Sequence, residues 1–403
     1  SKICHPIIRS AKGAYFTAIN GERYFDAGLG AGSQILGHAN SKVIKTVERQ
    51  IKDGSIYLCN HSQIHEFCDR LIEVLPSDHF HYVFCNSGSE ATHRALRIAR
   101  AATGKERIGY FQGGWHGMNE WTLCEDAGHF GNNFLKTEDG IPKSVKHHSL
   151  SLPYNDDKAF NLISKNANSL ACIIIEPVQG SNPRNDILPF LKDLEDCCKQ
   201  NNILLVVDEI ITGFRLGIGG ASKSWGLNPD IITYGKIVGG GLPIGLVAST
   251  ENVAIKSFKN PEKKILTGGT FSANPLVSAT GLAVIKELQR LDYSELDDLG
   301  NFMRAKLNNV FAIENLPFSA IGVGSISRLA FTNKSFRNRL ERDKLEASYE
   351  VKNKFRLKIL DQNVLWPTNG ILFTGFCHSR KQISNLCDKI FIVARQLVTN
   401  NEL

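Results

Sequence analysis

Several features common to other protein classes are missing from this sequence. No apolar run approaches the ~20 residues that a helix needs to cross a bilayer, so we expect no membrane-spanning segment. The first residues, SKICHP, contain no apolar stretch and no small-residue cleavage site of the kind found in a secretory signal. We therefore expect a cytoplasmic location.

The ten cysteines are scattered, and none form paired C-x-x-C motifs with partner histidines. This excludes the usual spacing of a zinc site, and we predict no metal centre. A disulfide framework is not expected in a chain of this length without a secretion signal. We expect most of the cysteines to be reduced and buried as small apolar residues.

Two common nucleotide-binding signatures are also missing. The sequence contains neither the G-x-x-x-x-G-K-[ST] phosphate loop nor the G-x-G-x-x-G dinucleotide fingerprint. The net charge of +7 is modest and spread along the chain, so no nucleic-acid partner is predicted. A small molecule is the expected partner.

The 403 residues alternate between short apolar runs and segments with helical periodicity. Apolar runs of four to six residues predict strands covered on both faces, as in a mostly parallel sheet. Amphipathic helices are predicted between them, at 89–104 and 189–200 for example. The predicted fold class is therefore α/β, with strands at 82–85, 171–175, 203–207, 231–234 and 244–249.

The two ends of the chain have a different pattern. Asn20 and Gly21 form a strong hairpin signal between two short apolar stretches, and a helix is predicted over 41–54. Helices are also predicted over 294–311 and 345–360, with a strand near 371–376. We expect an N-terminal segment 1–55 that joins a smaller α+β domain, a large domain 56–290 and a C-terminal small domain 291–403.

A turn rich in serine and glycine follows the first of these central strands. Ser87, Gly88 and Ser89 precede a predicted helix, whose free N–H groups can bind an anion such as a phosphate. The alternative is that a serine simply caps the helix.

A second glycine-rich turn carries an aromatic residue in the segment GGWHG. Trp115 could stack on a flat ligand, although a single tryptophan is more often a core or surface residue. His116 alone is more typical of a structural hydrogen-bonding histidine.

A carboxylate and a lysine lie at the ends of two apolar strands. Asp208 follows five apolar residues, at the sheet edge where ligands bind in open α/β folds. The alternative is that Asp208 caps a helix or forms a structural ion pair. Lys236 follows another such strand and precedes a run of glycines, an enclosed setting that disfavours the ammonium form. The alternative is that the side chain of Lys236 simply extends to the surface.

Together these features supply what a phosphorylated pyridine aldehyde needs. The turn can hold the phosphate, the tryptophan can stack, the carboxylate can keep the pyridine nitrogen protonated, and the lysine can hold the aldehyde. The combination predicts a pyridoxal 5′-phosphate enzyme.

The order of motifs resembles the class III aminotransferases of fold type I, close to the glutamate-1-semialdehyde 2,1-aminomutase group. The resemblance covers nearly the whole chain through SGSEA, WHG, EPVQG, VVDEIITGFR, YGKIVGGGLPIG and GGTFSANP. It implies that Lys236 forms a Schiff base with the cofactor and that Asp208 pairs with its pyridine nitrogen. It also implies a homodimer in which Thr270 reaches the phosphate of the neighbouring subunit. The cofactor contacts expected from the motifs are Ser87, Gly88, Ser89, Trp115, His116, Glu176, Asp208, Ile210, Lys236 and Thr270.

The substrate pocket departs from the family pattern. By counting from the motifs, three bulky or polar pocket residues of the aminomutase fall at Ala31, Gly128 and Gly370, which predicts a roomier and less polar site. Ser181 stands where ornithine- and GABA-type members carry a glutamate that holds a substrate-binding arginine. We therefore expect that arginine–glutamate pair to be missing.

The leading hypothesis is transfer of an amino group between an amine or amino-acid donor and a small carbonyl acceptor, catalysed by Lys236 and Asp208. An intramolecular aminomutase of the glutamate-1-semialdehyde type is the alternative within the same chemistry. A non-catalytic relative of the fold is the alternative from another class.

Overall fold

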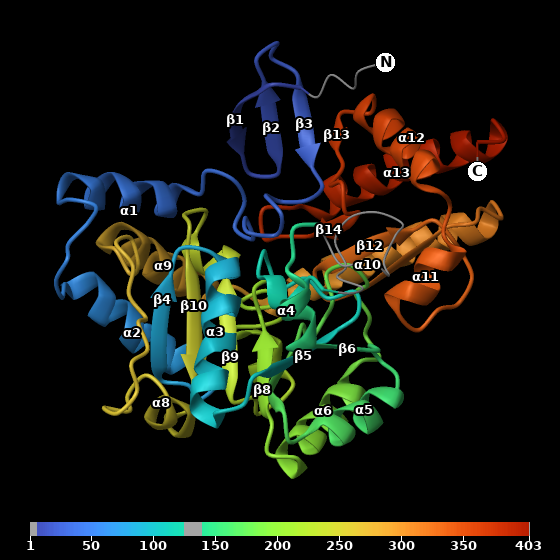
Figure 1. Ribbon diagram of the computed structural model, residues 1–403. Coiled ribbons are helices and arrows are strands. Elements are labelled where there is room, and N and C mark those ends of the chain that lie inside the picture. The colour runs from blue at the N-terminus through green and yellow to red at the C-terminus, as the bar shows by residue number, and fades with distance from the viewer. Residues whose placement is uncertain (1–5, 125–138, 403) are drawn as a thin grey trace.

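The centre of the molecule is a seven-stranded sheet, whose strands lie side by side in the lower half of Figure 1. The computed structural model describes residues 6–124 and 139–402. The strand order is β4-β10-β9-β8-β7-β5-β6. The bounds are β4 (His81–Cys85), β5 (Arg107–Phe111), β6 (Ser149–Leu152), β7 (Leu170–Ile175), β8 (Leu204–Asp208), β9 (Ile231–Gly235) and β10 (Gly245–Ser249).

The five strands predicted in this region are confirmed, and the sheet is mostly parallel. β5 to β9 pair in parallel. The exception is β10, which runs antiparallel to both of its neighbours. Apolar strand patterns do not encode direction, so the sequence could not indicate this reversal.

The strands are apolar along their whole length because helices cover both faces of the sheet. In β7 every residue is buried, with Cys172 and Ile174 packed toward α3 and Ile173 and Ile175 packed toward α5 and α6. This period of two between opposite faces is the geometry of a strand. The helices of this part are α1 (Ser41–Lys52), α2 (Ser62–Val74), α3 (Gly88–Thr103), α4 (Lys143–His147), α5 (Lys158–Asn166), α6 (Leu188–Gln200), α7 (Gly220–Ser224), α8 (Glu251–Lys256) and α9 (Pro275–Leu288), with the 3₁₀ turns η1 (Glu120–Thr122) and η2 (Lys236–Gly239).

Segments from both chain ends meet in the upper part of Figure 1. The hairpin at Asn20 and Gly21 is confirmed, and β13 pairs in parallel with β3. One sheet has the order β1-β2-β3-β13 and the other β11-β12-β14. Their strands are β1 (Ile8–Lys12), β2 (Tyr15–Ala18), β3 (Arg23–Asp26), β11 (Ser319–Val323), β12 (Ile326–Ala330), β13 (Val364–Leu365) and β14 (Ile371–Phe373). The domain boundaries at residues 55 and 290 stay a prediction.

Four helices follow residue 290 in the described part of the chain: two were predicted from the sequence, one of them with a wrong start, and those that begin at Arg339 and Arg380 were not predicted. They are α10 (Tyr293–Ile313), α11 (Arg339–Leu345), α12 (Tyr349–Leu360) and α13 (Arg380–Thr399). The single helix predicted over 345–360 is wrong at its start, because Leu345 ends α11 and α12 begins at Tyr349. The hydroxyl of Ser348 accepts from the N–H of Val351 and caps α12 there.

Among the helices of the described residues, none is both long and apolar enough to cross a membrane.

Candidate functional site

The predicted site residues come together at the carboxyl ends of β7, β8 and β9. Parallel strands bring these ends to one edge of the sheet, where α/β folds bind ligands. A pocket of about 160 Å³ lies there. Of the ten predicted cofactor contacts, eight line it: Gly88, Ser89, Trp115, His116, Glu176, Asp208, Ile210 and Lys236. The other two, Ser87 and Thr270, do not.

Asp208 is the last residue of β8, and its buried carboxylate is held from three sides. One oxygen accepts from the hydroxyl of Thr233 at 3.0 Å and from the N–H of Ile210 at 3.1 Å. The other lies 2.7 Å from Nδ1 of His116. These bonds offset the cost of burying the carboxylate and fix its direction toward the pocket.

His116 and Thr233 thus act through Asp208. The sequence patterns had marked His116 but not Thr233. The one available signal was a hydroxyl residue within the apolar strand IITYG. A buried Thr in such a strand needs a polar partner, and here the partner is Asp208.

Lys236 directly follows β9 and begins η2. Its φ of +47° lies in the left-handed region, which costs a non-glycine residue roughly 1–3 kcal/mol and is typical of functional sites. Burial lowers the pKa of Lys236 and the charge of Arg215 lowers it further, whereas Asp208 and Glu176 oppose both effects. The net direction is downward, which favours the neutral, nucleophilic amine.

Glu176 follows β7 and is fully enclosed. Its carboxylate accepts from the N–H of Trp115 at 2.9 Å and from the N–H of Gly180 at 3.3 Å. Burial and the nearby Asp208 raise the pKa of Glu176 to about 7, although His116 and the two N–H donors lower it. This carboxyl group can therefore exchange a proton near neutral pH.

The first turn of α3 forms one end of the pocket. The hydroxyl of Ser87 caps the helix by accepting from Glu90 N–H at 3.1 Å, and its contact with a cofactor stays a prediction. The N–H groups of Gly88 and Ser89 have no acceptor within the helix. The hydroxyl of Ser89 accepts from Met118 N–H at 3.1 Å and keeps its own proton to donate. The turn can therefore bind an anion.

A larger cleft of about 480 Å³ adjoins the pocket and shares Trp115, Ile211 and Lys236 with it. Its walls are mostly apolar and include Phe16, Trp366 and Phe373. Ala31 lines this cleft as predicted for a substrate-pocket position. We call it the outer cleft.

Three other positions that depart from the family pattern are Gly370, Ser181 and Gly128. A side chain at Gly370 would meet Nη1 of Arg328 at 3.0 Å, so the arginine occupies that space. Ser181 is buried and donates its hydroxyl to the carbonyl of Gly113 at 2.7 Å. Gly128 lies outside the described residues.

Thr270 is exposed and does not line the pocket within this chain. The preceding segment is fixed to α3, because Arg94 donates to the carbonyls of Thr267 and Gly268. Leu266 and Phe271 beside it are 74% and 55% exposed.

The pocket fits pyridoxal 5′-phosphate by its donor set. It offers a helix N-terminus for the phosphate, a buried carboxylate for the pyridine nitrogen, and an amine for the aldehyde. In addition, Nε2 of His116 is buried and has no hydrogen-bond partner among the described residues. A polar ligand group would satisfy it.

Comparisons with known proteins agree with this geometry. Residues 2–365 match the family model "Aminotransferase class-III". The chain is 35% identical to the glutamate-1-semialdehyde 2,1-aminomutase of Methanobrevibacter smithii over 80% of this chain and 76% of that protein. It is also 35% identical to the enzyme of that name from Sulfolobus acidocaldarius, over 97% and 93%. A solved transaminase with PLP bound has a TM-score of 0.88 at 22% identity, with 100% of this chain and 93% of that chain covered.

Proposed function

Since the chain belongs to the class III aminotransferases, enzymes with a pyridoxal 5′-phosphate cofactor, we propose that it transfers an amino group from an amine or amino-acid donor to a small carbonyl acceptor. The observation that carries the proposal is the pairing of Lys236 and Asp208 in one pocket. The lysine is mostly buried with a lowered pKa, and the carboxylate is fixed by three hydrogen bonds.

Each end of the cofactor has a partner in this proposal. Lys236 holds the aldehyde carbon, Asp208 holds the pyridine nitrogen, and the first turn of α3 holds the phosphate. Trp115 and Ile210 line the pocket where the two faces of the ring would lie. When bound, the cofactor supplies an electron-withdrawing ring that acidifies the C–H bond next to the substrate nitrogen.

The side chains then handle protons. Asp208 accepts from the protonated pyridine nitrogen and keeps the proton there. The amine of Lys236 removes a proton from the substrate carbon and delivers it to the other carbon bonded to the nitrogen, because its lowered pKa leaves it able to accept a proton near neutral pH. The outer cleft receives the rest of the substrate.

We also propose a homodimer in which Thr270 reaches the phosphate of the partner subunit. Two observations support it: Thr270 is exposed away from the pocket of its own chain, and exposed apolar side chains lie on either side of it. Exposed apolar groups in one place are typical of an interface. Leu58 and Met118, 84% and 68% exposed, are further candidates for this surface.

An intramolecular aminomutase is the second candidate, favoured by the name of the relatives that are 35% identical. The two functions differ in what leaves the enzyme. A transaminase treated with a single amine donor releases one equivalent of keto product per site, whereas a mutase returns only the isomer.

The proposed function is tested by the absorbance of the purified protein. We expect the yellow colour of bound pyridoxal phosphate, which bleaches when a suitable amine donor is added. We expect Lys236→Ala to abolish turnover while a non-covalently bound cofactor remains detectable. A protein that stays colourless after addition of pyridoxal phosphate would sink the proposal.

A further inference from the structure

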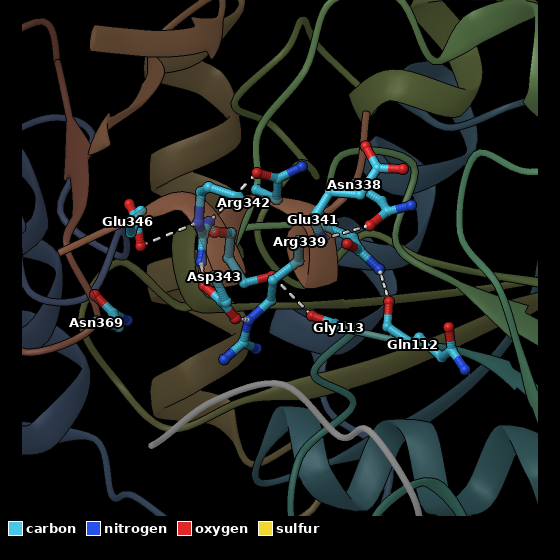
Figure 2. A network of polar contacts seen from close by, with 12 residues as sticks. Gln112, Gly113, Asn338, Arg339, Glu341, Arg342, Asp343, Glu346 and Asn369 are labelled. Carbon is cyan, nitrogen blue, oxygen red and sulfur yellow. Dashed lines mark hydrogen bonds and ion pairs between the residues drawn. The ribbon is translucent and has the colours of Figure 1, made fainter. Parts of the chain in front are cut away.

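Helix α11 carries a buried group of ion pairs next to two loops of the cofactor pocket, those that contain Gly113 and Ser181. Figure 2 shows Arg342 and Asp343 between Glu346 on one side and the loop of Gln112 and Gly113 on the other. We call Arg339, Arg342, Asp343 and Glu346 the α11 cluster. No sequence motif pointed to it, and the proposed reaction makes no direct use of it.

The α11 cluster is fixed by several ion pairs of low exposure. Nη2 of Arg342 lies 2.6 Å from Asp343, and its Nε lies 3.3 Å from Glu346. Asp343 also pairs with Arg339 at 3.1 Å. Glu346 pairs with Lys352 at 2.6 Å.

Glu346 stays ionised over any practical assay pH. Burial alone would raise its pKa, but Arg342, Arg328 and Lys352 outweigh burial and lower the pKa to about 2. Glu346 therefore keeps its charge, and with it the ion pairs to Arg342 and Lys352, throughout the neutral range.

The cluster is joined to the loops of the cofactor pocket through Arg342. Its Nη1 donates to the carbonyl of Ser181 and, at 3.3 Å, to the side-chain oxygen of Asn182. Ser181 in turn donates its hydroxyl to Gly113 at 2.7 Å. Arg342 thus connects α11 to the loop that precedes Trp115.

Close packing between α11 and this loop accompanies the hydrogen bonds. Gly113 has a φ of +79°, and a side chain there would meet Cβ of Arg339 at 3.1 Å. Only glycine fits this position without strain. The helix and the loop are therefore in close contact at Gly113.

The same loops meet again at Glu176. Its carboxylate accepts from Gly180, next to Ser181, and from Trp115, two residues after Gly113. Trp115 forms part of the boundary between the cofactor pocket and the outer cleft. A continuous path of contacts therefore runs from Arg342 to the wall of the site.

We propose that Arg342 is a positioning residue, which holds the turn of residues 179–182 against Gly113 and thereby sets Trp115 against the cofactor ring. The position of Ser181 is where ornithine- and GABA-type relatives carry a glutamate. In this chain Ser181 instead joins Arg342 to Gly113 by hydrogen bonds. The inference rests on the proposed function for the identity of the ligand.

The test is the affinity of the apo-protein for pyridoxal phosphate and for pyridoxamine phosphate. The second ligand lacks the aldehyde, so it reports ring and phosphate contacts without the bond to Lys236. We expect Arg342→Met to raise both dissociation constants about tenfold and to change the visible circular dichroism of the bound ligand. After this substitution, Arg339 still pairs with Asp343, and Lys352 and Arg328 still face Glu346, so no carboxylate is left unpaired.

Two further variants complete the experiment. Ser181→Ala removes only the hydroxyl bond to Gly113, and we expect about a threefold weakening of both ligands. Arg337→Met is the matched control, because this exposed arginine precedes α11 and pairs with Glu341 at 3.0 Å, with no ion pair to the α11 cluster. Its affinities should equal those of the wild type.

The outcomes separate the two proposals. Wild-type affinities in Arg342→Met, together with a lower melting temperature of the apo-protein, would show a merely structural role and overturn the inference. If Arg342→Met does not fold, unchanged affinities in Ser181→Ala overturn it instead. A wild-type protein that binds neither ligand would overturn the proposed function and this inference with it.

Discussion

Three ionisable side chains meet at the carboxyl edge of the central sheet, and their surroundings favour a different protonation form for each. Lys236 is driven toward its neutral amine, and Glu176 toward its neutral acid. Asp208 is surrounded by three donors that stabilise its charged form. Two groups able to exchange a proton therefore flank a carboxyl group that hydrogen bonds hold in place.

Glu176 should make the stability of the apo-protein depend on pH. Its folded pKa of about 7 exceeds the ordinary value of 4.5, so the folded protein holds a proton that the unfolded chain releases between these values. The stabilisation is complete below pH 4.5 and is lost as the pH rises through 7. At about 1.4 kcal/mol per pKa unit, the loss is about 3 kcal/mol.

Urea unfolding of the apo-protein at several pH values measures this loss. Glu176→Gln, which keeps an oxygen acceptor without a titrating proton, should flatten the profile between pH 4.5 and 7. Parallel profiles for the two proteins would contradict the assignment.

Asp208→Asn should affect catalysis more than binding. An amide there cannot hold a proton on the pyridine nitrogen by charge, so we expect proton removal from the substrate to slow by about 100-fold or more. Cofactor affinity should change much less, because Thr233 and Ile210 can still donate to the amide oxygen. Stopped-flow half-reactions and cofactor titration measure the two effects. Equal losses in both would argue against this role.

At the scale of elements, the first turn of α3 depends on close contact with the WHG loop. Gly117 has a φ of +80°, and a side chain there would meet Oγ of Ser89 at 2.3 Å. Ser89 is also the acceptor for Met118 N–H, so the loop and the helix start form one unit.

Gly117→Ala should therefore raise the cofactor dissociation constant by more than tenfold. Gly104→Ala is the matched control at the other end of α3, where φ is +71° and the space is open. Backbone strain should cost the control about 1 kcal/mol of stability without changing cofactor affinity. Cofactor titration and thermal unfolding of both variants distinguish a local clash from general strain.

The elements that could be predicted from the sequence are those with a simple periodic signal. β7 and α3 were predicted within a residue or two, because the apolar run and the amphipathic helix follow directly from burial. The break between α11 and α12 was missed, since Arg339 and Arg342 look like exposed residues in sequence. They are buried because Arg342 donates to Ser181 and Asn182 and Arg339 packs near Gly113, and contacts with residues so far along the chain do not appear in a local pattern.

For the site, residues carried by motifs were predicted and residues that support them were not. Eight expected contacts line one pocket because glycine-rich turns and strand ends have recognisable sequences. Thr233 and Arg342 act through hydrogen bonds to residues far along the chain. Their roles depend on tertiary contacts and could not be read from neighbouring residues.

At the scale of the whole molecule, the proposed dimer predicts complementation between two defective chains. Thr270→Ala should weaken cofactor binding, and Lys236→Ala should abolish turnover. When the two are mixed and allowed to exchange subunits, one site of each mixed dimer combines an intact Lys236 with Thr270 from the partner. Activity at limiting cofactor should rise above that of either variant alone. No rise, with subunit exchange verified by mass spectrometry, would contradict a contribution across the interface.

The pairing of β3 with β13 has a consequence for the synthesis of the chain. Phe25 and Asp26 emerge from the ribosome long before their partners Val364 and Leu365 are made. Until then the edge of β3 is without its neighbour, and contacts of such long sequence separation form slowly. Asp26 and Leu365 also line the outer cleft, so the wall of this cleft is completed only after residue 365 has been made.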